Sequence, residues 1–296
     1  MERVSIVIPT LNRADYLDGC LQALADLDYP RDRYEVVVVD GGSTDETPAV
    51  VKKHAANFAS LRLLVETKKG SSAARNFGFQ HVEHDYVALT DDDAVVHQDW
   101  LKNFMARADK DKLLVGKVVS YENGNVQYGC RRSTFIGGSI PLPDFLKRFA
   151  NHGCTCNMFV PKQVWNTIGG FDEELITAFD DSSFCLHALL HGYNVQYVDD
   201  AAVFHKRELK RPERFAQHIM YRTYGMLKIY TDSRLQRILF SFLNALYVYL
   251  QFCVFLYKYG WEFATNAVKA MFQGHRLYKQ KMALVISGDV PSAQRT

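Results

Sequence analysis

Short apolar runs alternate with segments of helical spacing through the first part of the chain. The runs are Val4–Ile8, Tyr34–Val39, Leu61–Val65 and Tyr86–Leu89. Between the first two runs, leucines recur at steps of three and four, which predicts a helix over Ala14–Leu27. Strands joined by a helix form a βαβ unit, and continuous Val and Ile runs are typical of parallel strands that are buried on both faces. The pattern predicts an α/β fold with a mostly parallel sheet flanked by helices.

Three consecutive carboxylates, Asp91, Asp92 and Asp93, follow the run Tyr86–Leu89. They are expected at the carboxyl end of a strand, where open α/β sheets place their ligands. Like charges repel one another unless a cation or hydrogen-bond donors neutralise them. Because Mg²⁺ is held in proteins by one or two carboxylates plus the oxygens of a substrate phosphate, a hard divalent cation explains the cluster. The alternative is a solvated acidic turn.

Two more loops carry binding chemistry. Asp40 opens the loop after the second run and offers an acceptor for a base N–H or a ribose hydroxyl, and the glycines that follow allow a close backbone approach. The same residues also suit an ordinary turn before a helix over Thr47–His54. The segment Gly70–Gly78 is expected to begin a helix whose free N–H groups favour anions, and Arg75 adds a planar donor fork. Together the loops predict a diphosphate-binding site.

These segments occur in the order and spacing of the family 2 glycosyltransferases, the inverting nucleotide-sugar enzymes of GT-A fold, which the chain resembles over about residues 1–205. The matching segments are Val4–Arg13, Val36–Asp45, Gly70–Gly78, Leu89–Ala94, Cys156–Lys162, Gly169–Glu173 and Asp180–Tyr193. The resemblance implies transfer of a sugar from a nucleotide-diphosphate donor, with a UDP-sugar favoured, to a glycan or lipid-linked acceptor.

The resemblance also implies a role for each matching residue. Asp93 is expected to bind Mg²⁺ or Mn²⁺ directly, with Asp91 near the ribose or the metal, and His205 to close the metal and diphosphate site. Asp181 aligns with the catalytic base. Asp180 replaces the family's usual Glu, which leaves the base assignment ambiguous by one residue. The expected nucleotide-sugar-binding residues are Pro9, Thr10, Asp40, Arg75, Asp91 and Asp92. The alternative for His205 is a loop imidazole, and for the Asp pair a cap on a helix over Ser182–His191.

Some positions depart from the family pattern. Gly41 stands where the family often has a second Asp, so recognition of the base would depend on Asp40 alone. Ser183 and His187 stand where it often has Asp and Arg, which weakens any inference about the acceptor. Two other functions stay open. A sugar-nucleotide pyrophosphorylase would carry a Gly-rich Arg/Lys signature near its start, which is not seen here, and a non-catalytic nucleotide-sugar-binding protein would lack the base.

Composition bounds the function further. The chain has 296 residues, 48% of them hydrophobic, and a net charge of +2, which supports a sizeable core and gives no indication of nucleic-acid binding. The six cysteines show no Cys-x-x-Cys spacing, which argues against zinc and for reduced core thiols, with Cys154 and Cys156 expected in a buried strand. Residues Met1–Pro9 lack the features of a signal peptide, so a cytoplasmic protein is expected.

The composition changes after His205, which predicts a catalytic domain over residues 1–210 and a helical region over 211–296. Lys206–Pro212 is a basic linker, and helix is expected from near its end. Ile238–Tyr257 then runs 20 residues without a charge, about 30 Å as a helix. A transmembrane anchor, an interfacial helix and a packing or dimer helix all compete. Its polar stripe of Ser241, Asn244, Gln251 and Lys258, followed by the basic amphipathic segment Trp261–Ile286, favours peripheral contact with the cytoplasmic face of a membrane, with a homodimer through 212–296 as the alternative.

Overall fold

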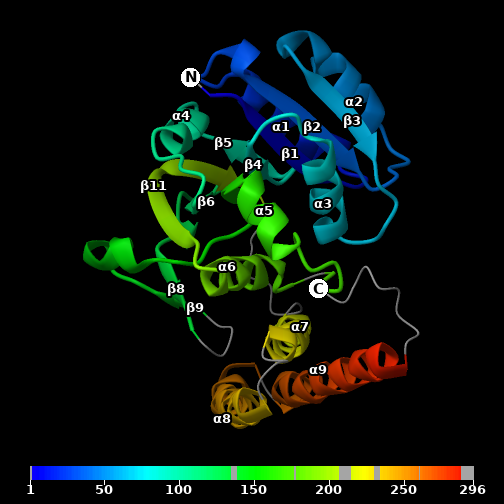
Figure 1. Cartoon of the computed structure of the whole chain (residues 1–296), viewed down its shortest axis with the longest axis vertical. Coiled ribbons are helices and arrows are strands. Elements are labelled where there is room, and N and C mark those ends of the chain that lie inside the picture. Colours follow the sequence, from blue (N-terminus) through cyan, green and yellow to red (C-terminus); the bar gives the residue numbers. More distant parts are fainter. Residues whose placement is uncertain are drawn as a thin grey trace. The chain divides into compact units, whose positions relative to one another are not determined.

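The computed structural model describes residues 2–134, 139–176, 178–206, 215–229, 234–259 and 261–287. The chain divides into two compact units (Figure 1). The first comprises Met1–Ser133, Ser139–Ile176 and Asp180–Leu209, and the second comprises Thr134–Gly138, Thr177–Phe179 and Lys210–Thr296. The two short segments that group with the second unit were not indicated by the sequence. The expected division into domains 1–210 and 211–296 remains a prediction.

A nine-stranded sheet forms the centre of the first unit. Its strands are β1 (Val4–Thr10), β2 (Tyr34–Asp40), β3 (Leu61–Val65), β4 (Tyr86–Thr90), β5 (Ala94–Val96), β6 (Lys112–Ser120), β7 (Val126–Tyr128), β10 (Asn157–Pro161) and β11 (Asn194–His205). They follow the order β3-β2-β1-β4-β10-β6-β11-β5, and β7 pairs with β6. The four predicted apolar runs are β1 to β4, all mutually parallel. The strand β10 lies antiparallel between β4 and β6.

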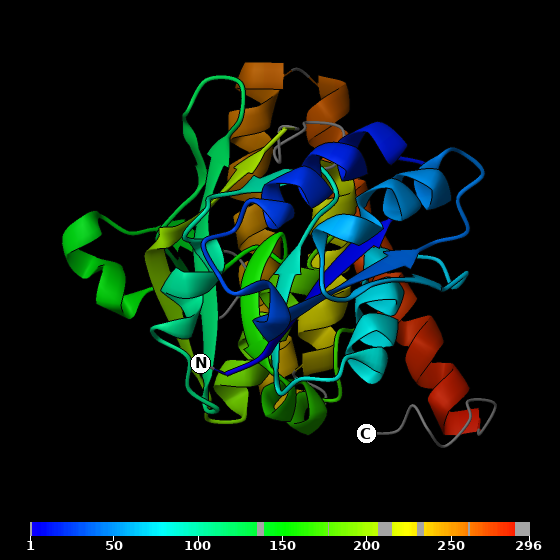
Figure 2. The ribbon, with the colours of Figure 1, turned by 90° about the horizontal axis from the view of Figure 1, so that it is seen from above.

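Helices cover both faces of this sheet (Figure 2). On one face lie α1 (Ala14–Ala25), α2 (Thr47–His54) and α4 (Trp100–Met105), and on the other α3 (Ser71–His81), α5 (Lys162–Ile168) and α6 (Asp180–Leu190). Because side chains alternate along a strand, Ile6 of β1 packs in the cluster with Leu17 of α1, while Val7 packs in the cluster with Phe79 of α3. The predicted α/β fold is confirmed.

Shorter elements connect these layers. They are η1 (Arg31–Arg33), η2 (Ala55–Asn57), η3 (Asp144–Phe149) and the separate hairpin β8 (Arg131–Ser133) with β9 (Ser139–Pro141). The expectation that Cys154 and Cys156 lie in a buried strand was wrong. Both are buried, but they belong to a turn in which the Asn157 N–H donates to the Cys154 carbonyl (3.0 Å), and β10 begins only at Asn157.

The second unit contains three helices among its described residues: α7 (Phe215–Ile229), α8 (Arg234–Tyr259) and α9 (Trp261–Ser287). Their shared core includes Ile219, Val248 and Ala267. Gly274 permits the close crossing of α7 and α9, because a Cβ there would lie 2.5 Å from the Met220 carbonyl oxygen. The helices expected within 238–257 and 261–286 are confirmed. The expected linker beyond Lys206 and the start near Pro212 lie outside the described residues.

The central part of α8 is turned opposite to what its polar stripe suggested. Asn244 is fully buried, where it accepts a hydrogen bond from Arg222 Nη2 (2.6 Å) and donates one to Thr223 Oγ1 (3.0 Å). The polar stripe therefore does not mark a water-facing side at Asn244, because this amide satisfies buried groups of α7. The large hydrophobic side chains that α8 exposes are Leu235, Ile238, Leu239, Phe242, Leu246, Tyr249, Leu250, Leu256 and Tyr257. Within the part of the chain that the structure describes, no helix is long and apolar enough to cross a membrane.

Candidate active site

The ends of three parallel strands bring most of the predicted donor-site residues together. Thr10 ends β1, Asp40 ends β2, and the Asp cluster begins immediately after β4. Since β1 lies between β2 and β4, all three ends meet at one edge of the sheet. Pro9 is a half-buried residue of β1, and its neighbour in the register of β2 is Val39.

Asp40 is buried and held in a turn of its own loop. Its Oδ1 accepts hydrogen bonds from the Ser43 backbone N–H (2.9 Å) and from Ser43 Oγ (2.5 Å). The loop is also tied to β1, because the Gly41 N–H donates to the Thr10 carbonyl (2.9 Å). These bonds fix the position of the carboxylate that was predicted to bind the nucleoside.

Asp92 is clamped inside the protein. Its Oδ2 accepts from Thr10 Oγ1 (2.8 Å) and its Oδ1 from Arg13 Nη1 (2.7 Å), and the same Arg13 nitrogen lies 3.2 Å from Asp93 Oδ2. Burial raises the pKa of Asp92 to about 6, although Arg13 and Thr10 partly offset it. Sequence reasoning missed Arg13, which stands in the Val4–Arg13 segment, because only the pairing of β1 with β4 places it opposite the carboxylates.

Asp93, the predicted direct metal ligand, and His205, which was predicted to close the metal and diphosphate site, lie together. His205 is the last residue of β11 and pairs with Ala94 of β5, which places it beside the Asp cluster. The imidazole Nε2 lies 3.0 Å from Asp93 Oδ1, and both side chains are 5% exposed. The Lys206 N–H donates to the Asp93 carbonyl (2.8 Å), which closes the loop over the pair.

Arg75 connects the Asp cluster to the predicted base. It lies on α3, is buried, and donates from Nη2 to Asp91 Oδ1 (2.9 Å) and from Nη1 to Asp180 Oδ2 (2.9 Å). Burial disfavours the charged guanidinium, but these two carboxylates raise the pKa of Arg75 above its ordinary value. Breaking a buried ion pair typically costs 3–5 kcal/mol, so this bridge also fixes α6 to α3.

Asp180 and Asp181 form the first turn of α6, which begins at Asp180, two residues earlier than expected. Burial and the neighbouring Asp180 raise the pKa of Asp181 to about 7, although hydrogen bonds from the Ser182 N–H (2.6 Å) and Oγ (3.2 Å) partly offset the rise. Burial also raises the pKa of Asp180, while Arg75 opposes that rise. Of the two, Asp181 can therefore exchange a proton near neutral pH without giving up an ion pair with Arg75.

The segment before α6 is fixed to α3 by Asn76. Its side chain accepts from the Phe171 N–H (2.8 Å) and donates to the Phe171 carbonyl (2.9 Å) and to Glu173 Oε1 (2.8 Å). Gly170 has φ +84°, and a Cβ there would lie 2.7 Å from Asn76 Oδ1. Gly170 is thus required for close packing against the helix that carries Arg75, whereas Gly169, with φ +78°, ends α5 in the left-handed conformation.

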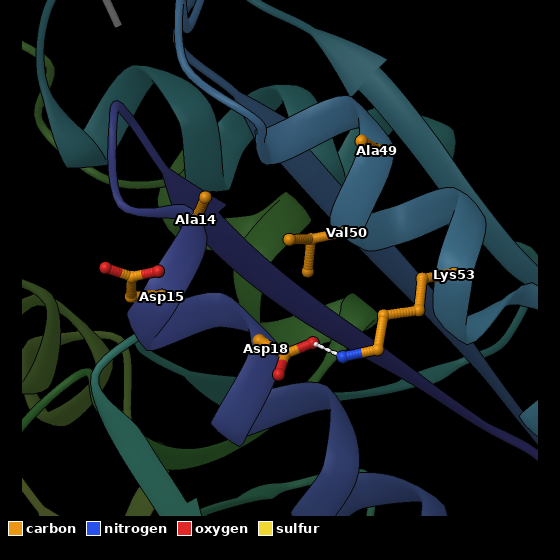
Figure 3. A pocket seen from close by; sticks show the side chains of 6 residues that line it. All are labelled: Ala14, Asp15, Asp18, Ala49, Val50 and Lys53. Carbon is orange, nitrogen blue, oxygen red and sulfur yellow. Dashed lines mark hydrogen bonds and ion pairs between the residues drawn. The ribbon is translucent and has the colours of Figure 1, made fainter.

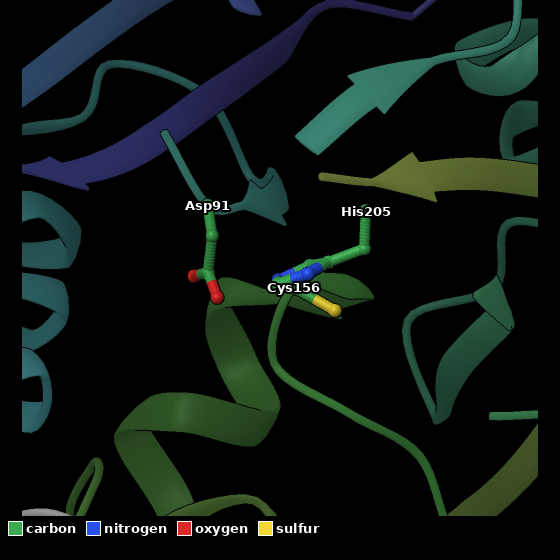
Figure 4. A group of neighbouring side chains, drawn as sticks. All are labelled: Asp91, Cys156 and His205. Carbon is green, nitrogen blue, oxygen red and sulfur yellow. The ribbon is translucent and has the colours of Figure 1, made fainter. Parts of the chain in front are cut away.

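A third donor type lies beside the carboxylates. Ligand atoms of Asp91, Cys156 and His205 all lie within 4.8 Å of one another (Figure 4). Cys156 is buried, and its Sγ lies 3.2 Å from Cys154 Sγ. This hydrogen bond, together with burial, raises the pKa of the Cys156 thiol well above its ordinary value. All six cysteines are free thiols. From the sequence, Cys156 was expected only as a core thiol and as the start of the matched segment Cys156–Lys162, because the sequence does not reveal that β10 pairs with β4.

The charge balance of this cluster fits a cation. Its carboxylates are Asp91, Asp92, Asp93, Asp180 and Asp181, and its guanidinium groups are Arg13 and Arg75. The excess of carboxylates raises the energy of the site unless protons or a metal ion balance it. Carboxylate and imidazole ligands suit several divalent ions, so the side chains that were predicted to hold Mg²⁺ or Mn²⁺ form a suitable donor set.

A pocket of about 360 Å³ lies away from these residues, between α1 and α2 (Figure 3). It is lined by Ala14, Asp15, Asp18, Ala49, Val50 and Lys53. Lys53 Nζ lies 2.7 Å from Asp18 Oδ1, an exposed pair that satisfies both charges. The pocket shares no residue with the Asp cluster, and its wall holds none of the predicted site residues.

The segments that form this site also match known proteins. The model of glycosyl transferase family 2 matches residues 5–166, more than half of the chain. The chain belongs to glycosyl transferase family 2. A second model, glycosyl transferase family group 2, matches residues 86–283. Glycosyltransferase AglE of Haloferax volcanii is 30% identical over 204 residues, which cover 68% of this chain and 66% of AglE. The chain spans 66% of AglE and 36% of the curated Staphylococcus aureus protein TarS, and these matches favour a glycosyltransferase over a sugar-nucleotide pyrophosphorylase.

Solved structures agree with the fold. Residues 1–349 of Staphylococcus aureus TarS, in complex with UDP-GlcNAc, match with a TM-score of 0.62 at 19% identity, covering 90% of this chain and 79% of that one. The mannosyltransferase PcManGT of Pyrobaculum calidifontis, in complex with GDP-Man and Mn²⁺, matches with a TM-score of 0.60 at 21% identity, covering 96% and 80%. These likenesses confirm the predicted GT-A fold with its C-terminal helices.

Proposed function

We propose that the protein is an inverting, metal-dependent glycosyltransferase that moves a sugar from a nucleotide-diphosphate donor to a glycan or lipid-linked acceptor. The observation that carries the proposal is the Arg75 bridge. This guanidinium contacts Asp91 in the donor cluster and Asp180 beside the candidate base, both at 2.9 Å. One buried group therefore holds the donor side and the acceptor side of the reaction in fixed relation.

The donor side is assigned to the loops after β1, β2 and β4. Asp40 would accept a hydrogen bond from the nucleoside, with Pro9 and Thr10 lining that place. Asp93 and His205, with Asp91, would hold Mg²⁺ or Mn²⁺, and the ion when bound neutralises the charge that develops on the leaving diphosphate. A UDP-sugar is the favoured donor. TarS binds UDP-GlcNAc and PcManGT binds GDP-Man with Mn²⁺, which supports a nucleotide-sugar donor and leaves the choice of base to experiment.

The acceptor side is assigned to Asp181. In its ionised form it takes the proton of the acceptor hydroxyl while that oxygen attacks the anomeric carbon. Asp180 is paired with Arg75, so we assign it to positioning the site and not to accepting the proton. Since the proposal needs no protein nucleophile, a single displacement from the opposite face follows, with inversion at the anomeric carbon.

The test is a screen of UDP- and GDP-sugars for hydrolysis and transfer, followed by NMR of the product. An α-linked donor should yield a β-linked product. Lipid-linked and soluble glycans serve as the acceptor panel. Retention of the anomeric configuration would overturn the single displacement and the role of Asp181 together. If the folded protein, supplied with Mg²⁺ or Mn²⁺, turns over none of the nucleotide sugars, the donor assignment is wrong.

We further propose that the exposed apolar side of α8 attaches the enzyme to the cytoplasmic face of a membrane. Phe242 is 67% exposed and Tyr249 63%, on the side opposite Asn244. Burial of such side chains in the headgroup region, with attraction of basic side chains to anionic lipid, is what holds an interfacial helix. A lipid-linked or membrane-proximal acceptor agrees with this attachment, and a homodimer through residues 212–296 is the alternative.

Liposome flotation separates these readings. The full-length protein should float with vesicles that contain anionic lipid, and Phe242→Glu with Tyr249→Glu should reduce the floated fraction severalfold. Phe145→Glu is the matched control, because Phe145 is 81% exposed in the first unit and should not change flotation. A wild-type protein that ignores the vesicles, and whose sedimentation shifts from dimer to monomer in the α8 variant, would mean that this side of α8 serves dimerisation.

A further inference from the structure

Cys156 reaches the acidic cluster through the register of the sheet. β10 runs antiparallel to β4 with Asn157 opposite Thr90, so Cys156 and Asp91 are the next residues beyond that pair at the same edge. The place of Cys156 is fixed by its neighbour, since Asn157 Nδ2 donates to the carbonyls of Lys117 and Ala201, both at 2.8 Å. Its position is therefore set by the core and not by a flexible loop.

We propose that Asp91, Cys156 and His205 form a mixed cation site that takes thiophilic divalent ions, such as Zn²⁺, Co²⁺ or Cd²⁺, more tightly than Mg²⁺. The three ligand atoms already lie within 4.8 Å of one another (Figure 4). Oxygen, sulfur and nitrogen together are a donor set that zinc accepts. Mg²⁺ instead selects oxygen ligands in octahedral geometry, and a thiolate is a poor substitute.

The neighbours of Asp91 and Cys156 bear on how the two side chains would bind an ion. Arg75 donates to Oδ1 of Asp91, so the other carboxylate oxygen, Oδ2, can bind the ion. Binding releases the Cys156 thiol proton to solvent, because the thiolate is the ligand. Cys154 Sγ, 3.2 Å away, can then donate its S–H to that thiolate and orient it, as hydrogen bonds to metal ligands generally do.

The proposal refines the metal site of the proposed function, on which its catalytic meaning rests. His205 is common to both ligand sets, because its Nε2 lies 3.0 Å from Asp93 Oδ1. The absence of Cys-x-x-Cys spacing argued against zinc, but that criterion detects only sites built from closely spaced pairs of cysteines. A single Cys beside Asp and His from other strands leaves no such signal in the sequence.

The test uses the metal ion alone, without donor or acceptor, on the full chain kept reduced with a phosphine. Because Cys253 is the exposed thiol among the six, Cys253→Ser serves as the background. Titration with Co²⁺ should produce thiolate-to-cobalt charge-transfer absorption at one equivalent. Cys156→Ser in that background should lose the band. In calorimetry, its Cd²⁺ affinity should fall by at least about tenfold, while its Mg²⁺ affinity changes far less.

The site is disproved if the background protein binds Co²⁺ without the band, if Cys156→Ser keeps it, or if Mg²⁺ binds as tightly as Cd²⁺. Should Cys156→Ser fail to fold, X-ray absorption of the Co²⁺-loaded background protein decides the question. A sulfur neighbour is expected, and a shell of oxygen and nitrogen alone contradicts it. Sugar transfer by a protein that lacks the sulfur signature would refute this cation site while the proposed function stands. The sulfur signature in a protein that transfers no sugar would support the cation site and refute the proposed function.

Discussion

Replacing Asp181 with Asn is expected to lower kcat by about 10²- to 10⁴-fold, the range that a general base contributes, while leaving the affinity for the donor nearly unchanged. The amide keeps the size of the side chain but cannot take a proton. Asp180→Asn is the matched comparison, because it removes the neighbouring negative charge and its ion pair with Arg75 but not the candidate base. Steady-state kinetics and calorimetric binding of a nucleotide sugar give the two numbers. If Asp180→Asn is the inactive variant and Asp181→Asn is active, the base is Asp180.

The pH dependence gives an independent check of the same residue. The pKa of Asp181 is raised to about 7, and a base works only when ionised, so kcat/KM should rise with pH through about 7 and level off above it. Residual activity of Asp181→Asn should lack this limb. The contribution of Asp181 to the stability of the folded protein should instead fall as the pH rises. A folded-state pKa above the unfolded value favours folding at low pH, and this contribution is lost as the pH rises through 7. Thermal unfolding of Asp181→Asn should therefore occur at higher temperature than wild type at pH 8, with little difference at pH 4.

Asp93→Ala is expected to reduce transfer by about 10³-fold or more, since a bound metal ion supplies several kcal/mol of charge stabilisation. Asp93 lies 3.0 Å from His205 Nε2 and 3.2 Å from Arg13 Nη1, so the substitution removes the carboxylate that both contact. Chelator should abolish wild-type turnover, and Mg²⁺ or Mn²⁺ should restore it.

Asp15→Ala is the control, because it removes an exposed carboxylate of α1 that lies outside the donor cluster and should retain full activity. Circular dichroism and thermal unfolding establish that Asp93→Ala is folded. Undiminished wild-type turnover in the presence of chelator would contradict the metal role of Asp93.

Local patterns in the chain predicted the elements of the catalytic unit well. The apolar runs before Asp40 and Asp91 became β2 and β4, because continuous apolar strands are typical of parallel sheets that are covered on both faces. The contiguous donor loops were recognisable for the same reason, since the carboxyl end of a parallel strand is a fixed place in such sheets. The segment Cys154–Cys156 was misplaced, because buried residues in a turn and in a strand have the same apolar composition.

What the sequence by itself determined was the family, the α/β fold and the identity of the charged residues, because each depends on contiguous motifs and on local hydrophobic period. Tertiary structure alone decided which of those charges neutralise one another, because Arg75 is separated in sequence from Asp180 and Arg13 from Asp92. It also brought Cys156 beside Asp91. It also decided that Asn244 faces inward on α8, since a helical period defines a stripe but does not say what covers it. Long-range strand order and helix packing fix these pairings, and they depend on the burial of the whole chain rather than on any one segment.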